Sequence, residues 1–338
     1  MRAVVYSEPG PSSVLRVVER EVPEPGPGEV RVRVVRAGVN PTDWKQRAGG
    51  TYPALPYEEI TPGQDGAGTI DALGAGVSGV AAGDRVWLHM AQHGSAYGTA
   101  AEYVVVPLHK AVPLPPAASF DLGASLGVPA VTAHRALTSS ADADRIAPGT
   151  LAGRTVLVQG GAGAVGNAAI QLAHWAGANV ITTVSSAEKG ALAAAAGADH
   201  VVNYREEDPE AAIRRIAPDG VDLVVEVAPA QNNDLDRAVI RNGGTIAIYA
   251  NNGGDEMTLP LRATFSLNLR YQFVLLYGVA PELLAAAAED ITAALAAGAL
   301  GVGEEQGMPL HHYSLERAAE AHDAVEGGVV GKVLLDLA

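Results

Sequence analysis

The chain has 338 residues, and at roughly 150 residues per domain this length predicts two domains. Its 23 Lys and Arg against 38 Asp and Glu give a formal net charge of −15, which disfavours nucleic acid and anionic membranes as partners. Cys is absent, which excludes disulfides and Cys-based zinc sites, and no apolar run approaches the roughly 20 residues of a membrane span.

The first third of the chain is predicted to be mainly β structure. Short β-favouring segments bounded by Gly and Pro lie at residues 3–6, 29–37, 68–73, 85–89 and 101–106. Val and Arg alternate over residues 30–35, which predicts a strand with one face in water.

From about Val128 onward, apolar strands alternate with Ala-rich helices, as in a parallel sheet covered by helices. Strands are predicted at residues 155–159, 179–184, 200–203, 223–226 and 244–249, and helices at 165–176, 187–196, 209–216 and 233–239. Residues 273–277 could form a further strand, before helices at 282–297 and 315–325 and a strand at 332–337. We therefore expect an α/β protein with a doubly wound parallel sheet and a separate, mainly β domain.

A glycine-rich turn follows the strand at residues 155–159. Gly161, Gly163 and Gly166 satisfy the pattern G-x-G-x-x-G between a strand and a helix. Such glycines permit a tight turn and let the backbone approach a pyrophosphate at the helix N-terminus. The alternative is an ordinary glycine loop in a chain rich in Ala and Gly. The context favours dinucleotide binding.

The end of the next strand indicates which dinucleotide is bound. Ser185, Ser186 and Lys189 stand where an acidic residue would bind the ribose of NAD. Two hydroxyls and an ammonium accept a 2′-phosphate, so we predict NADPH as the cofactor. Tyr204 and Arg205 could flank the adenine. A plain surface position for Lys189 is the alternative.

Several motifs then occur in a set order: Ala37-Gly-Val-Asn-Pro-Thr-Asp43, Pro62-Gly-Gln-Asp-Gly-Ala-Gly68, Gly83-Asp-Arg-Val86, Ala101-Glu-Tyr103, Gly127-Val-Pro-Ala-Val-Thr-Ala-His-Arg-Ala-Leu137, the glycine turn, Asn203-Tyr-Arg-Glu206 and Gly331-Lys-Val333. Together they resemble the zinc-independent, ζ-crystallin-like quinone oxidoreductases of the medium-chain dehydrogenase/reductase superfamily. The resemblance covers essentially the whole chain.

This resemblance implies a GroES-like catalytic domain at residues 1–127, completed by residues 269–338. It implies an NADPH-binding Rossmann domain at residues 128–268, with the active site in the cleft between the domains. Many members pair an edge strand across subunits, and the apolar run at residues 273–277 resembles that strand. A cytoplasmic homodimer that acts on a small molecule, without nucleic acid or a membrane as partner, is therefore expected.

The resemblance also assigns roles to individual residues. It places Asn40 beside the nicotinamide and the substrate as a catalytic residue. Further cofactor contacts fall on Thr132, on the diphosphate-binding turn Gly161, Ala162, Gly163, Ala164 and Val165, on Ser185, Ser186, Lys189 and Tyr204, and on Tyr249, Asn251, Val274, Leu275, Leu276 and Lys332. For Lys332, a structural salt bridge is an equally good interpretation.

No metal site is expected. Zinc enzymes of the superfamily place Cys in the segment that here reads Asn40-Pro-Thr-Asp43, and His-Glu in the segment that here reads Gln64-Asp65. His89 and His93 are four residues apart but are predicted to lie in a loop, and the pair at residues 311–312 is interpreted as surface.

The position of Lys45 departs from the ζ-crystallin pattern, which has Tyr there. Lys45 could polarise a substrate oxygen, bind an acidic substrate or cofactor phosphate, or be solvent-exposed. We predict an NADPH-dependent quinone oxidoreductase that transfers hydride to a quinone. A reductase of enones and alkenals is the nearest alternative, and a non-catalytic NADPH-binding structural or regulatory protein is an alternative of another class.

Overall fold

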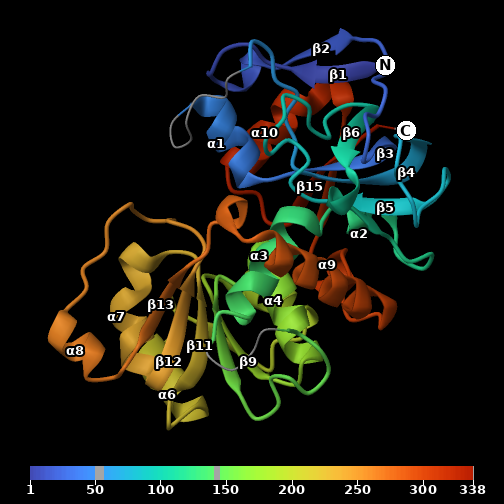
Figure 1. Ribbon diagram of the computed structural model, residues 1–338. Coiled ribbons are helices and arrows are strands. Elements are labelled where there is room, and N and C mark those ends of the chain that lie inside the picture. Colours follow the sequence, from blue (N-terminus) through green and yellow to red (C-terminus); the bar gives the residue numbers. More distant parts are fainter. Residues whose placement is uncertain (50–56, 141–144, 338) are drawn as a thin grey trace. The chain divides into compact units, whose positions relative to one another are not determined.

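The structure, a computed structural model, describes residues 1–49, 57–140 and 145–337 (Figure 1). The chain divides into two compact units. The first comprises Met1–Val128 with Pro309–Ala338, and the second comprises Pro129–Met308.

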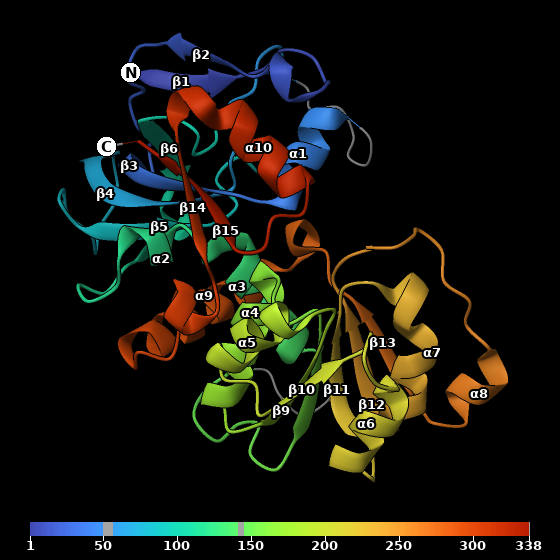
Figure 2. The ribbon, with the colours of Figure 1, turned by 180° about the vertical axis from the view of Figure 1, so that it is seen from behind.

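The first unit is built mainly of strands. They are β1 (Arg2–Val5), β2 (Arg16–Glu19), β3 (Glu29–Val39), β4 (Asp65–Leu73), β5 (Arg85–Leu88), β6 (Tyr103–Pro107), β7 (Ala111–Pro113), β14 (Leu310–Ser314) and β15 (Lys332–Asp336), with helices α1 (Pro41–Ala48), α2 (Phe120–Gly123) and α10 (Ala318–Glu326). The larger sheet has the order β14-β15-β3-β4-β5-β7, β6 pairs with β3, and β1 pairs with β2. Of these pairs β14 and β15 are parallel, and they lie side by side in Figure 2.

Strand β3 confirms the alternation that the sequence predicted. Val30, Val32 and Val34 are buried in the core of the first unit, whereas Arg33 between them is exposed. Because successive side chains of a strand point to opposite faces, one face of β3 packs inward and the other faces water.

The second unit contains a parallel sheet with helices around it. Its strands are β8 (Thr155–Gln159), β9 (Asn179–Val184), β10 (His200–Asn203), β11 (Val221–Glu226), β12 (Ile240–Ile248) and β13 (Arg270–Phe273), and its helices are α3 (Gly127–Leu137, beginning in the first unit), α4 (Ala164–Trp175), α5 (Ala187–Ala195), α6 (Pro209–Ile216), α7 (Pro229–Val239), α8 (Leu261–Phe265) and α9 (Pro281–Ala296). The strand order is β10-β9-β8-β11-β12-β13, and every pair is parallel. This is the doubly wound Rossmann order, as predicted.

Residues 269–308 lie in the second unit, whereas the sequence assigned them to the first domain. The reason is that β13 extends the parallel sheet beyond β12, from Thr245 opposite Arg270 to Ile248 opposite Phe273. The strand also ends at Phe273, where the predicted strand began. Only residues 309–338 return to the first unit.

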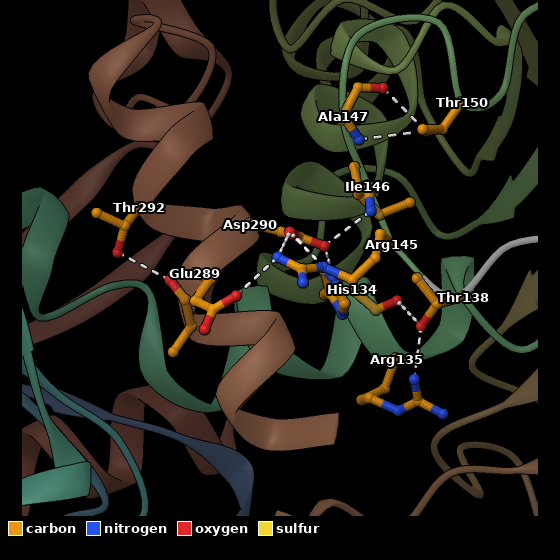
Figure 3. Close-up of polar contacts among 11 residues, drawn as sticks. His134, Arg135, Thr138, Arg145, Ile146, Ala147, Thr150, Glu289, Asp290 and Thr292 are labelled. Carbon is orange, nitrogen blue, oxygen red and sulfur yellow. Dashed lines mark hydrogen bonds and ion pairs between the residues drawn. The ribbon is translucent and has the colours of Figure 1, made fainter. Parts of the chain in front are cut away.

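Within the second unit, helix α9 contacts α3 and residues 145–146 through Asp290 (Figure 3). Its carboxylate accepts hydrogen bonds of 2.8 Å from His134 Nε2 on α3 and from the amide of Ile146, and it pairs with Arg145. Burial alone would favour the neutral acid, but these hydrogen bonds outweigh it and lower the pKa of Asp290 to about 2. Asp290 therefore holds α3, residues 145–146 and α9 together.

Among the residues that the structure describes, no helix combines the length and apolar character that crossing a bilayer requires.

Candidate functional site

The glycine-rich turn lies at the switch point of the parallel sheet. Strand β8 has β9 on one side and β11 on the other, so the strand order reverses there. In open sheets of this kind, ligands bind outside the carboxyl ends of the strands at the switch point. The turn after β8 leads into α4, whose N-cap is Gly163. The structure thus confirms the strand, turn and helix that the sequence predicted.

Two glycines of the turn allow close packing, and the third leaves space for a ligand. A Cβ on Gly161 would lie 2.1 Å from Thr182 Oγ1, and one on Gly166 would lie 2.5 Å from the carbonyl oxygen of Gly160, so the helix and strand pack closely. A Cβ on Gly163 would meet nothing nearer than 3.5 Å. The side of the turn at Gly163 is therefore open, as a bound diphosphate requires.

The residues predicted to bind a 2′-phosphate gather at the end of β9. Lys189 Nζ lies 3.2 Å from Ser185 Oγ, and Ser186 caps α5 by accepting a hydrogen bond from the amide of Lys189. The amide of Tyr204, after β10, donates to the carbonyl of Val184 at the end of β9. Two hydroxyls and an ammonium thus share one strand end, and the exposed Tyr204 ring directly follows the neighbouring strand β10.

A buried pair of carboxyls, which sequence reasoning missed, lies beside the switch point. Glu226 ends β11, and Asp236 lies on α7. Glu226 Oε1 accepts from the amide of Ala228, and Asp236 Oδ1 accepts from Gln159 Nε2 at 2.8 Å. The other two oxygens, Glu226 Oε2 and Asp236 Oδ2, are buried and have no further partner in the described parts of the chain. Burial, followed by the charge of Glu226 and a hydrogen bond to it, raises the pKa of Asp236 well above its usual value.

This pair is connected to the glycine turn through side chains. Gln159 donates to Asp236 and accepts from Thr183 Oγ1, whose oxygen lies 3.4 Å from the amide nitrogen of Gly160. The network therefore joins the ends of β8 and β9 to α7. An acid that ends an apolar strand, with a second acid ten residues later on a helix, is the sequence signal that could have revealed it.

The remaining predicted cofactor contacts of the second unit follow strand ends or lie on α3. Tyr249 directly follows β12, and its amide donates to the carbonyl of Glu226. Asn251 is exposed and donates to Asp255. The amide of Val274, which follows β13, donates to the carbonyl of Ile248. Leu275 is exposed, whereas Leu276 and, on α3, Thr132 are buried.

In the first unit, Asn40 joins a buried polar cluster. Asn40 follows β3, and its Nδ2 donates to Asp65 Oδ2 over 2.7 Å. Lys332, the first residue of β15, places Nζ 2.6 Å from Asn40 Oδ1 and 3.5 Å from Asp65 Oδ2. Strands β15, β3 and β4 are adjacent in the sheet, which brings these three side chains together. The sequence did not predict a role for Asp65.

Asp43 is a second buried acid near this cluster. Its Oδ2 accepts a hydrogen bond of 2.7 Å from the backbone amide of Asn40. Burial, followed by the negative charge of Asp65, raises the pKa of Asp43 to about 7, although Lys332 opposes this shift. Asp43 therefore titrates near neutral pH.

The predicted catalytic residue Lys45 lies on α1. It is half-buried, and its Nζ lies 5.9 Å from the ring centroid of Trp44.

His89, which the sequence placed in a loop, is buried. Its Nε2 donates to the carbonyl of His109 at 3.3 Å, and burial lowers the pKa of His89 to about 4. No group of three or more His, Asp or Glu side chains is placed to hold a metal ion in residues 1–49, 57–140 and 145–337.

Comparison with known proteins agrees with both units. A family model described as an alcohol dehydrogenase GroES-like domain matches residues 26–116, and one described as a zinc-binding dehydrogenase matches residues 164–293. The quinone oxidoreductase of Lama guanicoe is 34% identical over 339 residues, which cover 99% of this chain and 97% of that protein. The chain belongs to the quinone oxidoreductase family of the medium-chain dehydrogenase/reductase superfamily. The Homo sapiens quinone oxidoreductase is 32% identical with the same coverage.

Solved structures share the fold of this quinone oxidoreductase family member. The crystal structure of an NAD-dependent alcohol dehydrogenase has a TM-score of 0.87 and 33% identity, with 100% of both chains covered. The Escherichia coli quinone oxidoreductase complexed with NADPH has a TM-score of 0.82 and 26% identity, with 99% of this chain and 100% of that chain covered. The predicted family, the GroES-like and Rossmann architecture and the assignment as an oxidoreductase are thus confirmed.

Proposed function

We propose that this protein is an NADPH-dependent, zinc-independent quinone oxidoreductase that transfers hydride from NADPH to a quinone. The glycine turn at the switch point of β8 and β11 carries the proposal, because it provides an open helix N-terminus where a diphosphate binds. The names of the full-length relatives support a quinone as the acceptor.

The cofactor residues follow from the strand ends. The backbone from Ala162 to Val165 would bind the diphosphate, and Ser185, Ser186 and Lys189 would bind the 2′-phosphate. Tyr204 would flank the adenine, and Thr132, Tyr249, Asn251 and the backbone of Val274, Leu275 and Leu276 would surround the nicotinamide half. When bound, NADPH supplies a hydride to the acceptor.

The donor set supports a mechanism without zinc. The segments at the positions of the superfamily's zinc ligands, Asn40-Pro-Thr-Asp43 and Gln64-Asp65, include no thiolate or imidazole. The ammonium of Lys332 lies 2.6 Å from Asn40 and 3.5 Å from Asp65, so a cation already neutralises this cluster. A divalent ion does not fit there.

We assign the orientation of the acceptor to Asn40 and Lys45. The Asn40 amide would donate to an acceptor oxygen, and the Lys45 ammonium would favour the negative charge that develops on it. Electron-poor quinones need only modest polarisation of this kind. Conjugated enones are the next most easily reduced class, and Lys45 is the departure from the ζ-crystallin pattern that favours them.

The proposal is tested by NADPH oxidation with matched panels of quinones and enones, after exhaustive treatment with a chelator. We expect the highest kcat/KM with quinones and no effect of added zinc. A loss of activity that zinc restores would reject the zinc-free mechanism. Saturation of the C=C bond at higher kcat/KM would assign the protein to the enone reductases. Tight NADPH binding without turnover on any acceptor would assign it to the non-catalytic class.

The cofactor preference has its own test. Lys189→Glu places a carboxylate beside Ser185, so we expect NADPH affinity to fall at least tenfold while NADH affinity changes less than threefold. Arg262→Glu on α8 is the matched charge reversal, and it should change neither. If Lys189→Glu keeps the preference for NADPH over NADH, Lys189 does not bind the 2′-phosphate.

We also propose a homodimer that pairs through the edge strand β13. Phe273 at the end of that strand is 62% exposed, and Leu275, two residues beyond the strand, is 60% exposed. Light scattering should give twice 34.5 kDa, and Phe273→Arg should give the monomer. Phe265→Arg on α8, where the side chain is 58% exposed, is the control that should leave the dimer intact.

A further inference from the structure

The ammonium of Lys332 is fully used inside the first unit. Lys332 is 2% exposed, and its Nζ has three oxygen neighbours: Asn40 Oδ1 at 2.6 Å, the carbonyl of Val39 at 3.4 Å and Asp65 Oδ2 at 3.5 Å. An ammonium has three hydrogens to donate. Since three acceptors surround it, Lys332 has none left for a cofactor phosphate.

The two charged partners determine how the Asn40 amide is oriented. Its oxygen faces the ammonium of Lys332, and its nitrogen faces the carboxylate of Asp65 at 2.7 Å. The flipped amide would place its NH₂ group against a cation and its oxygen against an anion. Only one orientation is therefore favourable. Among the described residues, one N–H of this amide has no hydrogen-bond partner, whereas the amide oxygen also takes part in a capping box with the backbone of Asp43.

The backbone around this cluster is shaped to accommodate it. A Cβ on Gly38 would lie 2.1 Å from the carbonyl of Ala124 and 2.9 Å from Lys332 Cε. A Cβ on Gly127 would lie 2.1 Å from Asp65 Oδ1, which accepts the amide of Val128 at 2.7 Å. Asp65 thus uses one oxygen to hold the backbone and the other to hold Asn40.

We propose that Lys332 and Asp65 are positioning residues that hold the Asn40 amide in a single orientation, with its free N–H presented to the acceptor. This inference rests on the proposed reduction of a quinone. It assigns Lys332 to the orientation of Asn40 instead of to the cofactor.

Three variants separate positioning from stability: Lys332→Met, Asp65→Asn and the double variant. Each single variant leaves one buried charge unpaired, whereas the double variant removes both charges. We expect kcat with 1,4-benzoquinone to fall at least tenfold in all three, while the urea midpoint recovers only in the double variant. The Kd for NADPH, measured by fluorescence, should stay within twofold of the wild-type value.

Lys110→Met is the matched control. Lys110 is a partly buried lysine of the first unit that lies outside this cluster. Its Nζ donates to the carbonyls of Met90 and His93. Its loss should lower the urea midpoint and leave kcat unchanged. If both kcat and the urea midpoint recover in the double variant, Lys332 and Asp65 stabilise the fold and do not position Asn40. A tenfold rise in the Kd for NADPH in Lys332→Met would show that Lys332 binds the cofactor, which contradicts the proposal.

Hydrogen exchange of the Asn40 side-chain amide gives a readout that does not depend on turnover. With Asn-selective ¹⁵N labelling, the Nδ2 signal should be protected in the wild type and should exchange at least tenfold faster in Lys332→Met. An unprotected signal in the wild type would overturn the proposal even if quinones are reduced. Protection in a protein that reduces no quinone would overturn the proposed function alone.

Discussion

The two units bury charged side chains with different partners. In the first unit, the carboxylate of Asp65 lies 3.5 Å from the ammonium of Lys332, so opposite charges compensate each other. In the second unit, the carboxyls of Glu226 and Asp236 are neighbours, and their buried oxygens have no cation as partner within the described residues. Burial raises the pKa of Asp65 and lowers that of Lys332, but the opposite charge of the partner works against both shifts. In the second unit, the charge of Glu226 adds to the effect of burial and raises the pKa of Asp236 further. Both pairs lie beside predicted functional positions, yet they should respond differently to mutation and to pH.

Lys332→Met should have the largest effect on stability, because it leaves Asp65 as an unpaired buried charge. We expect the free energy of unfolding at pH 7 to fall by roughly 3–5 kcal/mol, and most of this loss to be recovered when Asp65→Asn is added. Urea unfolding of the two single variants and the double variant measures this coupling. Losses that simply add in the double variant would show that the two groups do not interact.

Asp43, like Asp65, is a buried acid of the first unit with a raised pKa. Its pKa of about 7 in the folded protein lies above that of an unfolded carboxyl. The stability it contributes is therefore complete below about pH 4 and is lost as the pH rises through about 7. Asp43→Asn should remove this dependence and reduce the change in unfolding free energy between pH 4 and 8 by at most about 4 kcal/mol. Parallel pH profiles for wild type and variant would contradict the raised pKa.

The smallest expected effect concerns the carboxyl pair. Glu226→Gln removes the negative charge that raises the pKa of Asp236, so Asp236 can ionise without that repulsion. The raised pKa of Asp236 implies that the wild-type protein loses stability as the pH rises through that value. We expect the variant to be more stable by about 1 kcal/mol at pH 8 and unchanged near pH 4. Glu320→Gln, at an exposed ion pair with Arg317, is the control. A variant that is less stable at pH 8 would contradict the raised pKa of Asp236.

The local parts of the site could be predicted from the sequence because their residues are neighbours in the chain. Gly161, Gly163 and Gly166 lie within one turn, and Ser185 and Lys189 lie four residues apart, so strand, turn and helix patterns were sufficient. Strands β3 and β15 of the first unit lie far apart in the chain, so no local pattern predicted that they pair.

The missed parts depend on distant or atypical residues. Asn40 and Lys332 are 292 positions apart, so their contact becomes visible only when β15 is placed beside β3. The one local sign of a buried polar contact is a lysine directly before the apolar residues 333–335 of this strand. Strand β13 was predicted three residues too late because its sequence, Arg270-Tyr-Gln-Phe273, is largely polar, and the domain boundary was misplaced with it.

The separation of Asn40 and Lys332 along the chain has a consequence for biosynthesis. A ribosome adds roughly 5–20 residues per second, so β15 emerges many seconds after β3. Until β15 emerges, Asp65 has no ammonium to compensate its charge, whereas all six strands of the parallel sheet are synthesised before that point. We therefore expect the nascent chain to complete its middle portion first and to close the sheet around Asn40 only when residues 332–336 arrive.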